Sequence, residues 1–392
     1  MSDPLGFIAK ELATLEDDAL LREVRALDSA QEPEVVLDGA RMILLASNNY
    51  LGLATHPQVV EAAAEAARRW GAGTGSARLI SGGMRLHDEL EERLAAFKRA
   101  GSALLFSSGY LANLGTISAL VSRGDAIFSD ELNHASIIDG ARLSHADVHV
   151  YRHADPEHLA TLLREHGARR RSLVVTDTVF SMDGDVAPLP EIVEVCERAG
   201  AILMVDEAHA TGVVGPGGRG TVAHFGLEGR VPVVMGTISK ALGSAGGYIA
   251  GSSDLIAYLR NRARAFIFDT APTPPTVAAA TAALAVLEHE PERPERARAL
   301  ARKLAAGLRA SGFAVPEPAA AIVPVVVGSS ETALAFAIAL LDQGVLVPAI
   351  RPPSVPAGTA RLRATVMATH SDAHIDAAVR AFAGARVGAW IP

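Results

Sequence analysis

Three continuous aliphatic segments, spaced about thirty residues apart, constrain the fold of this sequence more than any other feature. They are Ser172–Thr178, Ala201–Asp206 and Val231–Ile238. Pro190–Ala199, between the first two, has the pattern of a helix that stops at Gly200. A unit of this length is typical of parallel strands joined by a crossover helix, and uninterrupted aliphatic strands suit a sheet covered on both faces. The spacing therefore predicts a mainly parallel α/β domain.

Shorter segments extend this pattern toward the N-terminus. Three further strands are expected at Ala103–Phe106, Asp125–Ser129 and Val148–Tyr151. A helix is expected between Arg85 and Arg99, because apolar residues recur there on one helical face, at Leu86, Leu90, Leu94 and Phe97. We expect this large α/β domain to span residues 50–290.

The two ends of the chain are expected to form the rest of the molecule. Residues 1–49 are predicted to be a charged, helical segment that packs with a smaller domain. After the polar boundary Glu290–Arg296, residues 291–392 are predicted to be that smaller α+β domain. Its expected elements are the helices Ala297–Ala310 and Glu331–Leu341 and the segments Ile322–Val327 and Leu346–Ile350.

Charge and cysteine content exclude several classes of protein. With 36 basic against 44 acidic residues the formal net charge is −8, which argues against a general nucleic-acid or anionic-membrane binder. Cys196, the single cysteine, cannot form an intrachain disulfide or a multi-cysteine metal site, and we expect no metal. The first residues lack the apolar core of a signal peptide, and Thr276–Leu287 is shorter than the roughly 20 residues of a membrane span. We therefore expect a cytoplasmic protein.

Only four of the basic residues are lysines, and one of them lies in an unusual setting. Lys10, Lys98 and Lys303 occur in polar helical stretches, where a solvated ammonium group is expected. Lys240 instead follows an apolar strand within the glycine-rich segment Gly236–Gly247. Among small apolar neighbours the pKa of a lysine falls, and its amine becomes a nucleophile or Schiff-base partner. Taken alone, this pattern leaves a surface lysine in a glycine loop equally open.

A carboxylate and an imidazole follow the preceding strand. Asp206 ends that strand and His209 lies in the turn after it. Ligands of α/β sheets bind beyond the carboxyl ends of the strands, where Lys240 is also expected. This combination suits pyridoxal 5′-phosphate: the lysine holds the aldehyde, the aspartate keeps the pyridine nitrogen protonated, and the histidine bonds to the ring hydroxyl. The alternative is that Asp206 and His209 only cap a turn.

Other strand ends supply further candidates for the same site. The amides of Gly109 and Tyr110 begin a predicted helix and could bind a phosphate group, as could the hydroxyl of Thr237. His134 could stack on the cofactor ring, and Ser181 could contact the cofactor or the substrate. Each residue alone is compatible with an ordinary loop, so their shared position is what favours a site.

At this level of detail the sequence resembles the α-oxoamine synthases. These are fold-type I pyridoxal-phosphate enzymes that join an amino acid to an acyl thioester with loss of carbon dioxide. The resemblance extends from about Arg22 to His370, and the motifs that carry it are Asn48–Gly52, Gly73–Gly82, Ser108–Asn113, Asp130–His134, Phe180–Asp185, Asp206–His209 and Thr237–Gly247. It implies a large mainly parallel sheet domain and a smaller C-terminal α+β domain.

The resemblance also implies a role for individual residues. It assigns the Schiff base to Lys240, the pyridinium contact to Asp206, the ring-hydroxyl contact to His209 and ring stacking to His134. The further cofactor contacts that it implies are Gly109, Tyr110, Ser181, Thr237 and, across a dimer interface, Thr270. Arg22 and Arg351 would meet substrate carboxylates, with Ser354 on the substrate side. Asp269 stands where the family has a small hydroxyl residue, which places a negative charge near the contact expected of Thr270.

The segment Ile350–Arg363 resembles one branch of the family in particular. Its double proline and the following Val-Pro-Ala-Gly-Thr-Ala-Arg-Leu-Arg imply L-alanine and a pimeloyl thioester, carried on CoA or on an acyl carrier protein, as substrates. One alternative is a sister synthase that uses glycine or serine with another acyl thioester. Another is a non-catalytic regulatory protein that binds phosphate or pyridoxal phosphate. The resemblance further implies a homodimer with shared active sites.

Overall fold

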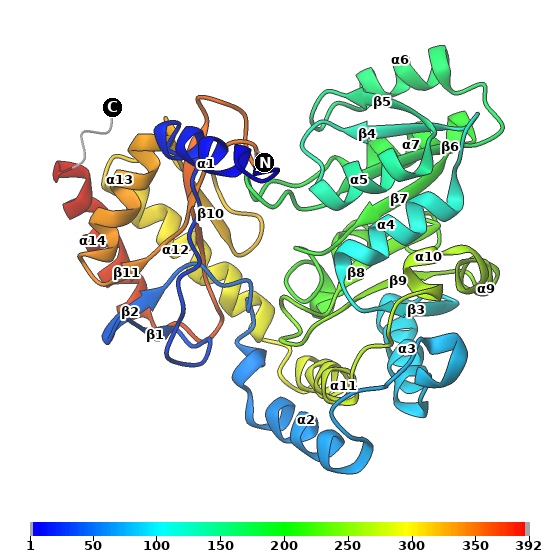
Figure 1. Cartoon of the computed structure of the whole chain (residues 1–392), viewed down its shortest axis with the longest axis horizontal. Coiled ribbons are helices and arrows are strands. Elements are labelled where there is room, and N and C mark those ends of the chain that lie inside the picture. Colours follow the sequence, from blue (N-terminus) through cyan, green and yellow to red (C-terminus); the bar gives the residue numbers. More distant parts are fainter. Residues whose placement is uncertain (1–2, 389–392) are drawn as a thin grey trace. The chain divides into compact units, whose positions relative to one another are not determined.

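The computed structural model describes residues 3–388 as two compact units (Figure 1). Unit 1 combines the N-terminal residues up to Ser47 with those from Ala299 onward, and unit 2 is Asn48–Arg298. We expected these divisions after residues 49 and 290. The second observed division falls inside helix α12 (Arg293–Ala310), because that helix begins within the polar stretch expected to be a boundary.

Unit 2 is built on a seven-stranded sheet with the strand order β3-β9-β8-β7-β6-β4-β5. All its strands are parallel except β9, which runs antiparallel to both of its neighbours. The six strands predicted for this domain are confirmed, with ends that differ by one or two residues. The strands are β3 (Ser102–Phe106), β4 (Ala126–Asp130), β5 (Asp147–Tyr151), β6 (Ser172–Asp177), β7 (Ile202–Asp206), β8 (Val233–Thr237) and β9 (Gly247–Gly251).

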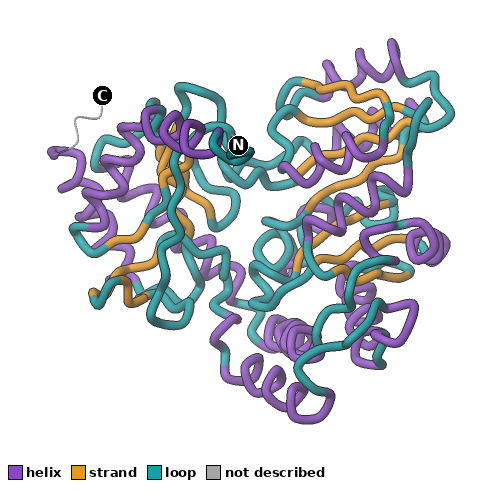
Figure 2. The backbone as a smooth tube through the Cα atoms, viewed as in Figure 1, coloured by secondary structure: helices purple, strands orange, loops and turns teal. Residues whose placement is uncertain are grey.

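Helices flank this sheet, as the alternating helices and strands of Figure 2 show. Alternate residues of the strands face one apolar layer, in which Ile127, Val175 and Met235 pack against helices that include α4 and α5. The predicted helix ending at Gly200 is confirmed as α7, and that glycine adopts a φ of 65°. The helices of unit 2 are α2 (Pro57–Trp70), α3 (Arg85–Lys98), α4 (Gly109–Leu120), α5 (Ala135–Ser144), α6 (Pro156–His166), α7 (Leu189–Ala199), α8 (Thr221–His224), α9 (Ser253–Arg262), α10 (Arg264–Ile267) and α11 (Pro274–His289), with the short turns η1 (Leu53–Thr55), η2 (Arg78–Gly82) and η3 (Pro216–Gly218).

Strand β9 was not predicted, because its glycines are typical of a loop. The structure shows why glycine is needed there. A Cβ atom on Gly247 would lie 2.5 Å from Cα of Gly109, the first residue of α4. The absence of a side chain therefore lets the N-terminus of α4 come directly against the sheet, and this contact places α4 at the edge where the site lies.

Unit 1 contains two small sheets of three strands each. One has the order β10-β13-β12 and is antiparallel, whereas in the other, β1-β2-β11, the β2–β11 pair is parallel. The helices of unit 1 are α1 (Phe7–Asp17), α13 (Ser330–Leu341), α14 (Asp372–Gly388) and the part of α12 from Ala299 onward. The strands are β1 (Glu34–Leu37), β2 (Ala40–Leu44), β10 (Ile322–Gly328), β11 (Val345–Leu346), β12 (Ala349–Ile350) and β13 (Ala360–Thr365).

The expectation that residues 1–49 are helical is wrong for their second half. Within residues 3–49, α1 is the only α-helix, and β1 and β2 form a hairpin. Asp38 and Gly39, at its tip, have φ values of 51° and 78°. Positive φ at both central residues is the geometry of a two-residue hairpin turn that matches the twist of the strands, which explains the Asp-Gly pair.

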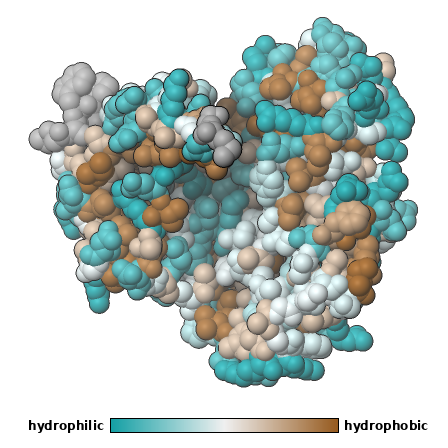
Figure 3. Space-filling model, viewed as in Figure 1, coloured by the Kyte–Doolittle hydropathy of each residue, from teal (hydrophilic) through white to brown (hydrophobic). Residues whose placement is uncertain are grey.

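Most of the surface in the view of Figure 3 is hydrophilic or of intermediate polarity, and apolar side chains form separate patches. One set of exposed apolar residues lies on α1 and just before it, at Leu5, Phe7, Ile8, Leu12 and Leu15. Among residues 3–388, no helix is both long enough and apolar enough to cross a membrane.

Candidate active site

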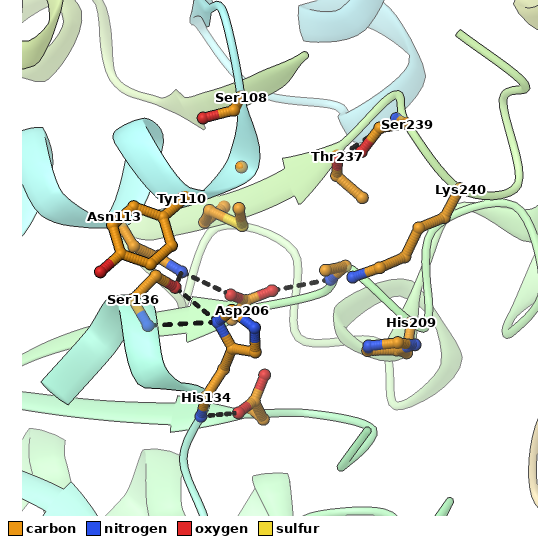
Figure 4. Close-up of a pocket in the computed structure, with 14 residues that line it drawn as sticks. Ser108, Tyr110, Asn113, His134, Ser136, Asp206, His209, Thr237, Ser239 and Lys240 are labelled. Atoms are coloured by element: carbon orange, nitrogen blue, oxygen red, sulfur yellow. Dashed lines mark hydrogen bonds between the residues drawn. The ribbon is translucent and has the colours of Figure 1, made fainter. Parts of the chain in front are cut away.

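A cavity of about 540 Å³, including its part open to solvent, lies in unit 2 where the parallel strands end. This volume falls in the range of about 300–1,000 Å³ that is usual for small-molecule sites. Its lining residues come from the ends of β6, β7 and β8 and from the loops and helices that follow β3, β4, β7 and β8, and Figure 4 shows their side chains converging. The residues that line it are Ser108, Gly109, Tyr110, Asn113, His134, Ser136, Asp177, Asp206, Ala208, His209, Met235, Thr237, Ser239 and Lys240.

The cavity brings together most of the residues that were predicted to form one site. Gly109, Tyr110, His134, Asp206, His209, Thr237 and Lys240 all line it. Ser181 and Thr270 also belong to unit 2 but lie outside this set, and Thr270 is exposed. Arg22, Arg351 and Ser354 belong to unit 1.

One side of the cavity is the N-terminus of α4. Ser108 caps this helix, since its hydroxyl accepts a hydrogen bond from the amide of Leu111 at 3.1 Å. The first amides of the helix therefore remain available for an anion, as Gly109 and Tyr110 were expected to be. Across from them, the Thr237 hydroxyl lies 2.6 Å from both the Ser239 hydroxyl and the carbonyl of Gly246. The amides at the start of α4 and the two hydroxyls are groups that could bind a phosphate.

Asp206 lies at the bottom of the cavity, where two donors hold it. Its Oδ2 accepts a hydrogen bond from Nδ2 of Asn113 at 2.7 Å, and its Oδ1 accepts one from the amide of Ala208 at 2.8 Å (Figure 4). The residue is 2% exposed. Both contacts orient the carboxylate, so that it presents a fixed negative charge to a ligand.

Asp177 is a second buried carboxyl group in the cavity, and it was not predicted. It pairs in register with Asp206 at the ends of β6 and β7. The pKa of Asp177 is raised well above the ordinary value of aspartate, because the side chain is buried and because Asp206 adds a second negative charge. A charged residue ending a continuous aliphatic strand, like Asp206 in the next strand, was the signal that could have identified it.

His134 is held at both its backbone and its ring. Its amide donates to Oδ2 of Asp177 at 2.8 Å, and its Nδ1 lies 2.7 Å from the hydroxyl of Ser136. Burial lowers the pKa of the imidazole below its usual value; the charge of Asp206 opposes this shift and that of Lys240 adds to it. The ring is therefore neutral near pH 7 and is fixed over the cavity.

His209 and Lys240 complete the polar lining. The Nδ1 of His209 lies 2.7 Å from the hydroxyl of Tyr50, which in turn donates to Asn48 at 3.0 Å. This contact explains the aromatic residue in the Asn48–Gly52 motif. Lys240 extends from the loop after β8 toward the region between Asp206 and His209 in Figure 4.

The residues present fit pyridoxal phosphate. The helix N-terminus and hydroxyls suit its phosphate group, Asp206 suits a protonated pyridine nitrogen, and the amine of Lys240 suits its aldehyde. Asn113, one of the residues that line the cavity, also has a buried side-chain atom, Oδ1, that lacks a partner among the described residues. A buried acceptor without a donor is costly, and it indicates that the cavity is built for a polar ligand.

Thr270 and Asp269 lie beside the segment that leads into α4. The hydroxyl of Ser107 donates a hydrogen bond to the carboxylate of Asp269. Ser107 lies two residues before Gly109 in the sequence, so this contact holds the carboxylate of Asp269 close to the start of α4. Thr270 itself forms an isolated bridge with Ala77.

The two arginines predicted to meet substrate carboxylates contact neighbouring backbone in unit 1. Arg22 donates to the carbonyl of Pro352 at 3.1 Å, and Arg351 donates to the carbonyls of Ala19 and Leu21. Burial lowers the pKa of Arg351, and the charge of Arg22 adds to this effect. Because the two positive charges act on each other, an anion bound near both of them would be stabilised.

The expectation for Lys98 is wrong. Its side chain is only 3% exposed and forms an ion pair with Glu207, which is fully buried. Lys98 is the last residue of α3, a helix rich in charged residues, where a solvated lysine is the ordinary expectation. Lys10 is exposed, as expected, whereas Lys303 is partly exposed and paired with Asp372 and Asp376.

Comparison with known proteins places these observations in a family. The model of class I and II aminotransferases matches residues 40–382. An 8-amino-7-oxononanoate synthase of Geobacter sulfurreducens is 50% identical over 384 residues, which are 97% of both chains. The protein of that name from Anaeromyxobacter dehalogenans is 52% identical over 379 residues, covering 97% of this chain and 95% of the relative.

Solved structures agree with this fold. A serine palmitoyltransferase of Sphingomonas wittichii superposes with a TM-score of 0.94 at 35% identity and covers 100% of both chains. An 8-amino-7-oxononanoate synthase of Francisella tularensis superposes with a TM-score of 0.75 at 26% identity, over 89% of this chain and 99% of that one. A serine palmitoyltransferase of S. paucimobilis, solved with bound PLP and myriocin, has a TM-score of 0.94 at 36% identity, with 99% of both chains covered.

Proposed function

This chain belongs to the class I and II aminotransferase family, and from that premise we propose that it is an 8-amino-7-oxononanoate synthase of biotin biosynthesis. It is a pyridoxal-phosphate-dependent acyltransferase. It condenses L-alanine with a pimeloyl thioester and releases 8-amino-7-oxononanoate, carbon dioxide and the free thiol carrier. The observation that carries the proposal is the identity of 50% to curated synthases over nearly the whole chain.

Pyridoxal phosphate, when bound, withdraws electrons from the α-carbon of an attached amino acid, which makes the α-proton removable. We assign its phosphate to the amides of Gly109 and Tyr110 and to the hydroxyl of Thr237, with Ser181 as a further contact. Asp206 would keep the pyridine nitrogen protonated and His209 would contact the ring hydroxyl. Both assignments rest on the fixed orientation of these side chains in the cavity.

Lys240 has two tasks in this proposal. Its Nζ would hold the aldehyde carbon of the cofactor, and binding of L-alanine would release this amine. The released amine then takes the proton from Cα of alanine and later returns a proton to the product. A single positioned amine suits both tasks, because the group that holds the aldehyde lies, once released, next to the carbon whose proton is transferred.

His134 provides a flat, neutral surface for the cofactor ring. Its lowered pKa and its contacts to Asp177 and Ser136 hold the imidazole in one orientation. From there its free ring nitrogen could bond to the thioester carbonyl as negative charge develops on the oxygen. Such a contact would stabilise the carbon–carbon bond-forming step.

We further infer that Arg22 and Arg351 bind substrate carboxylates, either of alanine or of the pimeloyl end, with Ser354 nearby on the substrate side. Arg351 is well suited because its guanidinium is mostly buried and already oriented by backbone carbonyls. A planar guanidinium binds a carboxylate through two parallel hydrogen bonds. The carrier of the pimeloyl group would be either CoA or an acyl carrier protein.

The proposed assembly is a cytoplasmic homodimer with shared active sites. Thr270 is exposed in the single chain, which leaves its hydroxyl free to reach the phosphate bound by a second subunit. Asp269, held by Ser107, would then lie close to that contact and weaken it.

A sister synthase is the second candidate, and the close superposition with serine palmitoyltransferases favours it. Purified protein with pyridoxal phosphate should be tested against L-alanine, glycine and L-serine, each with pimeloyl-CoA and palmitoyl-CoA, and thiol release should be followed. We expect release with L-alanine and pimeloyl-CoA. Activity with glycine or serine but not with alanine would favour the sister synthase. A protein whose visible absorption does not respond to any amino acid would instead be non-catalytic.

A further inference from the structure

We propose that the buried ion pair of Lys98 and Glu207 is a positioning pair, which holds the turn after β7 so that Asp206 and His209 both face the cofactor ring. The roles of Asp206 and His209 in this inference rest on the proposed function. Lys98 and Glu207 do not line the cavity and are not themselves catalytic residues.

Lys98 uses all three of its ammonium hydrogens on this turn and the loop beside it. Its Nζ donates to Oε2 of Glu207 at 2.6 Å, to the hydroxyl of Thr211 at 3.0 Å and to the carbonyl of Arg219 at 2.7 Å. Since an ammonium group has three donors and no acceptor, it is fully satisfied there. The end of α3 is thereby bonded to both ends of the turn Glu207–Thr211.

The carboxylate of Glu207 is equally well enclosed. Its second oxygen, Oε1, accepts a hydrogen bond from the amide of Val222 at 2.7 Å. Gly220, at a φ of 107°, leaves the space that it occupies, because a Cβ atom at that position would lie 2.2 Å from Oε2. The surroundings are therefore shaped around a charged side chain and not around an apolar one.

The residues of the turn divide between two sides. Asp206, Ala208 and His209 line the cavity, whereas Glu207 and Thr211 contact Lys98. The backbone of Glu207 is the centre of the turn, because its amide donates to Met235 on β8 and its carbonyl accepts from the amides of Ala210 and Thr211. A shift of Glu207 would therefore move the residues that bear the two cofactor contacts.

Stability alone does not explain such a pair. Burying two charges costs desolvation free energy that their attraction barely offsets, and apolar residues of similar volume often stabilise a protein more. Burial lowers the pKa of Lys98, but the charge of Glu207 raises it and the net shift is upward, so that the lysine keeps its proton at neutral pH. What an ionised pair provides here is a fixed geometry directly behind Asp206.

The test compares Lys98→Met and the isosteric Glu207→Gln with the wild-type holoenzyme. Lys303→Met is the matched control, because it removes an ammonium that is paired with two carboxylates in unit 1. For each protein we would measure the Kd for pyridoxal phosphate, the pH midpoint of the bound cofactor's visible band, kcat and KM for L-alanine, and the thermal midpoint of the apoprotein. The band midpoint reports on Asp206, since a less protonated pyridine ring withdraws fewer electrons and raises it.

We expect both variants to bind the cofactor with a raised band midpoint and with kcat lowered on the order of 10²-fold, because small displacements of catalytic groups have effects of that size. The KM for L-alanine should stay near the wild-type value, and the control should match the wild type. A Glu207→Gln protein with the wild-type midpoint and kcat would overturn the inference, even if Lys98→Met failed to fold. So would a lowered thermal midpoint without a change in the band. If the wild type bound the cofactor but did not use L-alanine, the proposed function would fail while the band midpoint still tested the positioning pair.

Discussion

Asp177 and Asp206 pair in register at the ends of two adjacent parallel strands, and both carboxyl groups line the same buried cavity. Only one of them can readily carry a negative charge, since two like charges this close repel each other and burial disfavours both. The raised pKa of Asp177 and the two donors to Asp206 assign the charge to Asp206.

This asymmetry predicts different results for the two isosteric substitutions. Asp177→Asn should change kcat less than 10-fold (about 1 kcal/mol in the barrier), because a neutral amide can still accept the hydrogen bond from the amide of His134. Asp206→Asn should lower kcat on the order of 10³-fold, since it removes a preorganised charge. Steady-state kinetics of both variants would check this. Equal losses would mean that the charge is shared.

A second prediction concerns the dependence of stability on pH. His153 lies between Asp130 and Asp185, at 3.0 Å and 2.8 Å, and although burial opposes the shift these carboxylates raise its pKa from 6.5 to about 10. Since the folded state binds the proton more tightly, the stabilisation is complete below pH 6.5 and is lost as the pH rises through about 10.

We therefore expect His153→Gln to lower the free energy of unfolding at pH 6 by about 1–2 kcal/mol, a value reduced for solvent screening of the partly exposed ring. The difference from the wild type should shrink toward pH 10. Urea unfolding at a series of pH values would measure it, with the exposed His145→Asn as control. A difference that stays constant with pH would contradict the assignment.

The contact between β9 and α4 predicts the effect of a single methyl group. Gly247→Ala should lower the free energy of unfolding by about 1–3 kcal/mol, because a Cβ atom there meets the backbone of Ser108 and Gly109 and the strand or helix must shift. It should also weaken binding of pyridoxal phosphate, since the amides at the start of α4 move with the backbone. Gly73→Ala is the control, as nothing lies within 4 Å of its added Cβ. Unchanged cofactor affinity in a destabilised Gly247→Ala protein would separate α4 from the phosphate site.

Arg351→Lys tests the proposed carboxylate contact in unit 1. Lysine keeps the charge but loses the planar pair of donors, so KM for the carboxylate-bearing substrate should rise about 10-fold, or about 1.4 kcal/mol. The affinity for pyridoxal phosphate should not change. The control is Arg41→Lys, whose side chain is 84% exposed in the same unit. If KM were unaffected for both substrates, Arg351 would have only its structural contacts to Ala19 and Leu21.

Much of unit 2 could be predicted because its strands are short aliphatic segments, such as Ser172–Thr178, whose regular spacing with a helix between them is typical of a parallel sheet. Strand β9 could not, because the glycines that allow α4 to approach it are also typical of loops. The hairpin of β1 and β2 could not be predicted, because it lies in a charged segment. The third strand of its sheet, β11, which pairs with β2, lies some three hundred residues away in the sequence.

In the site, too, some residues could be predicted from the sequence and others could not. Lys240, Asp206 and His209 could be predicted from their place at strand ends, where parallel sheets bring distant residues together. Lys98 was mistaken for a solvated residue because its burial depends on Glu207, which is 109 residues away in the sequence. Asp177 occupies the same position in β6 as Asp206 in β7, but it lies between Thr176 and Thr178, so the end of its strand is less distinct in the sequence.

The most direct test of the account is the mass of the product formed from L-alanine and pimeloyl-CoA by the purified protein with pyridoxal phosphate. We predict 8-amino-7-oxononanoate, together with one equivalent each of carbon dioxide and CoA. Lys240→Ala should lose the visible band of the bound cofactor and on the order of 10⁴-fold in rate, whereas the exposed Lys10→Ala should match the wild type. A Lys240→Ala protein with wild-type turnover, or a wild-type protein that forms this product from no combination of L-alanine and pimeloyl thioester, would contradict the account.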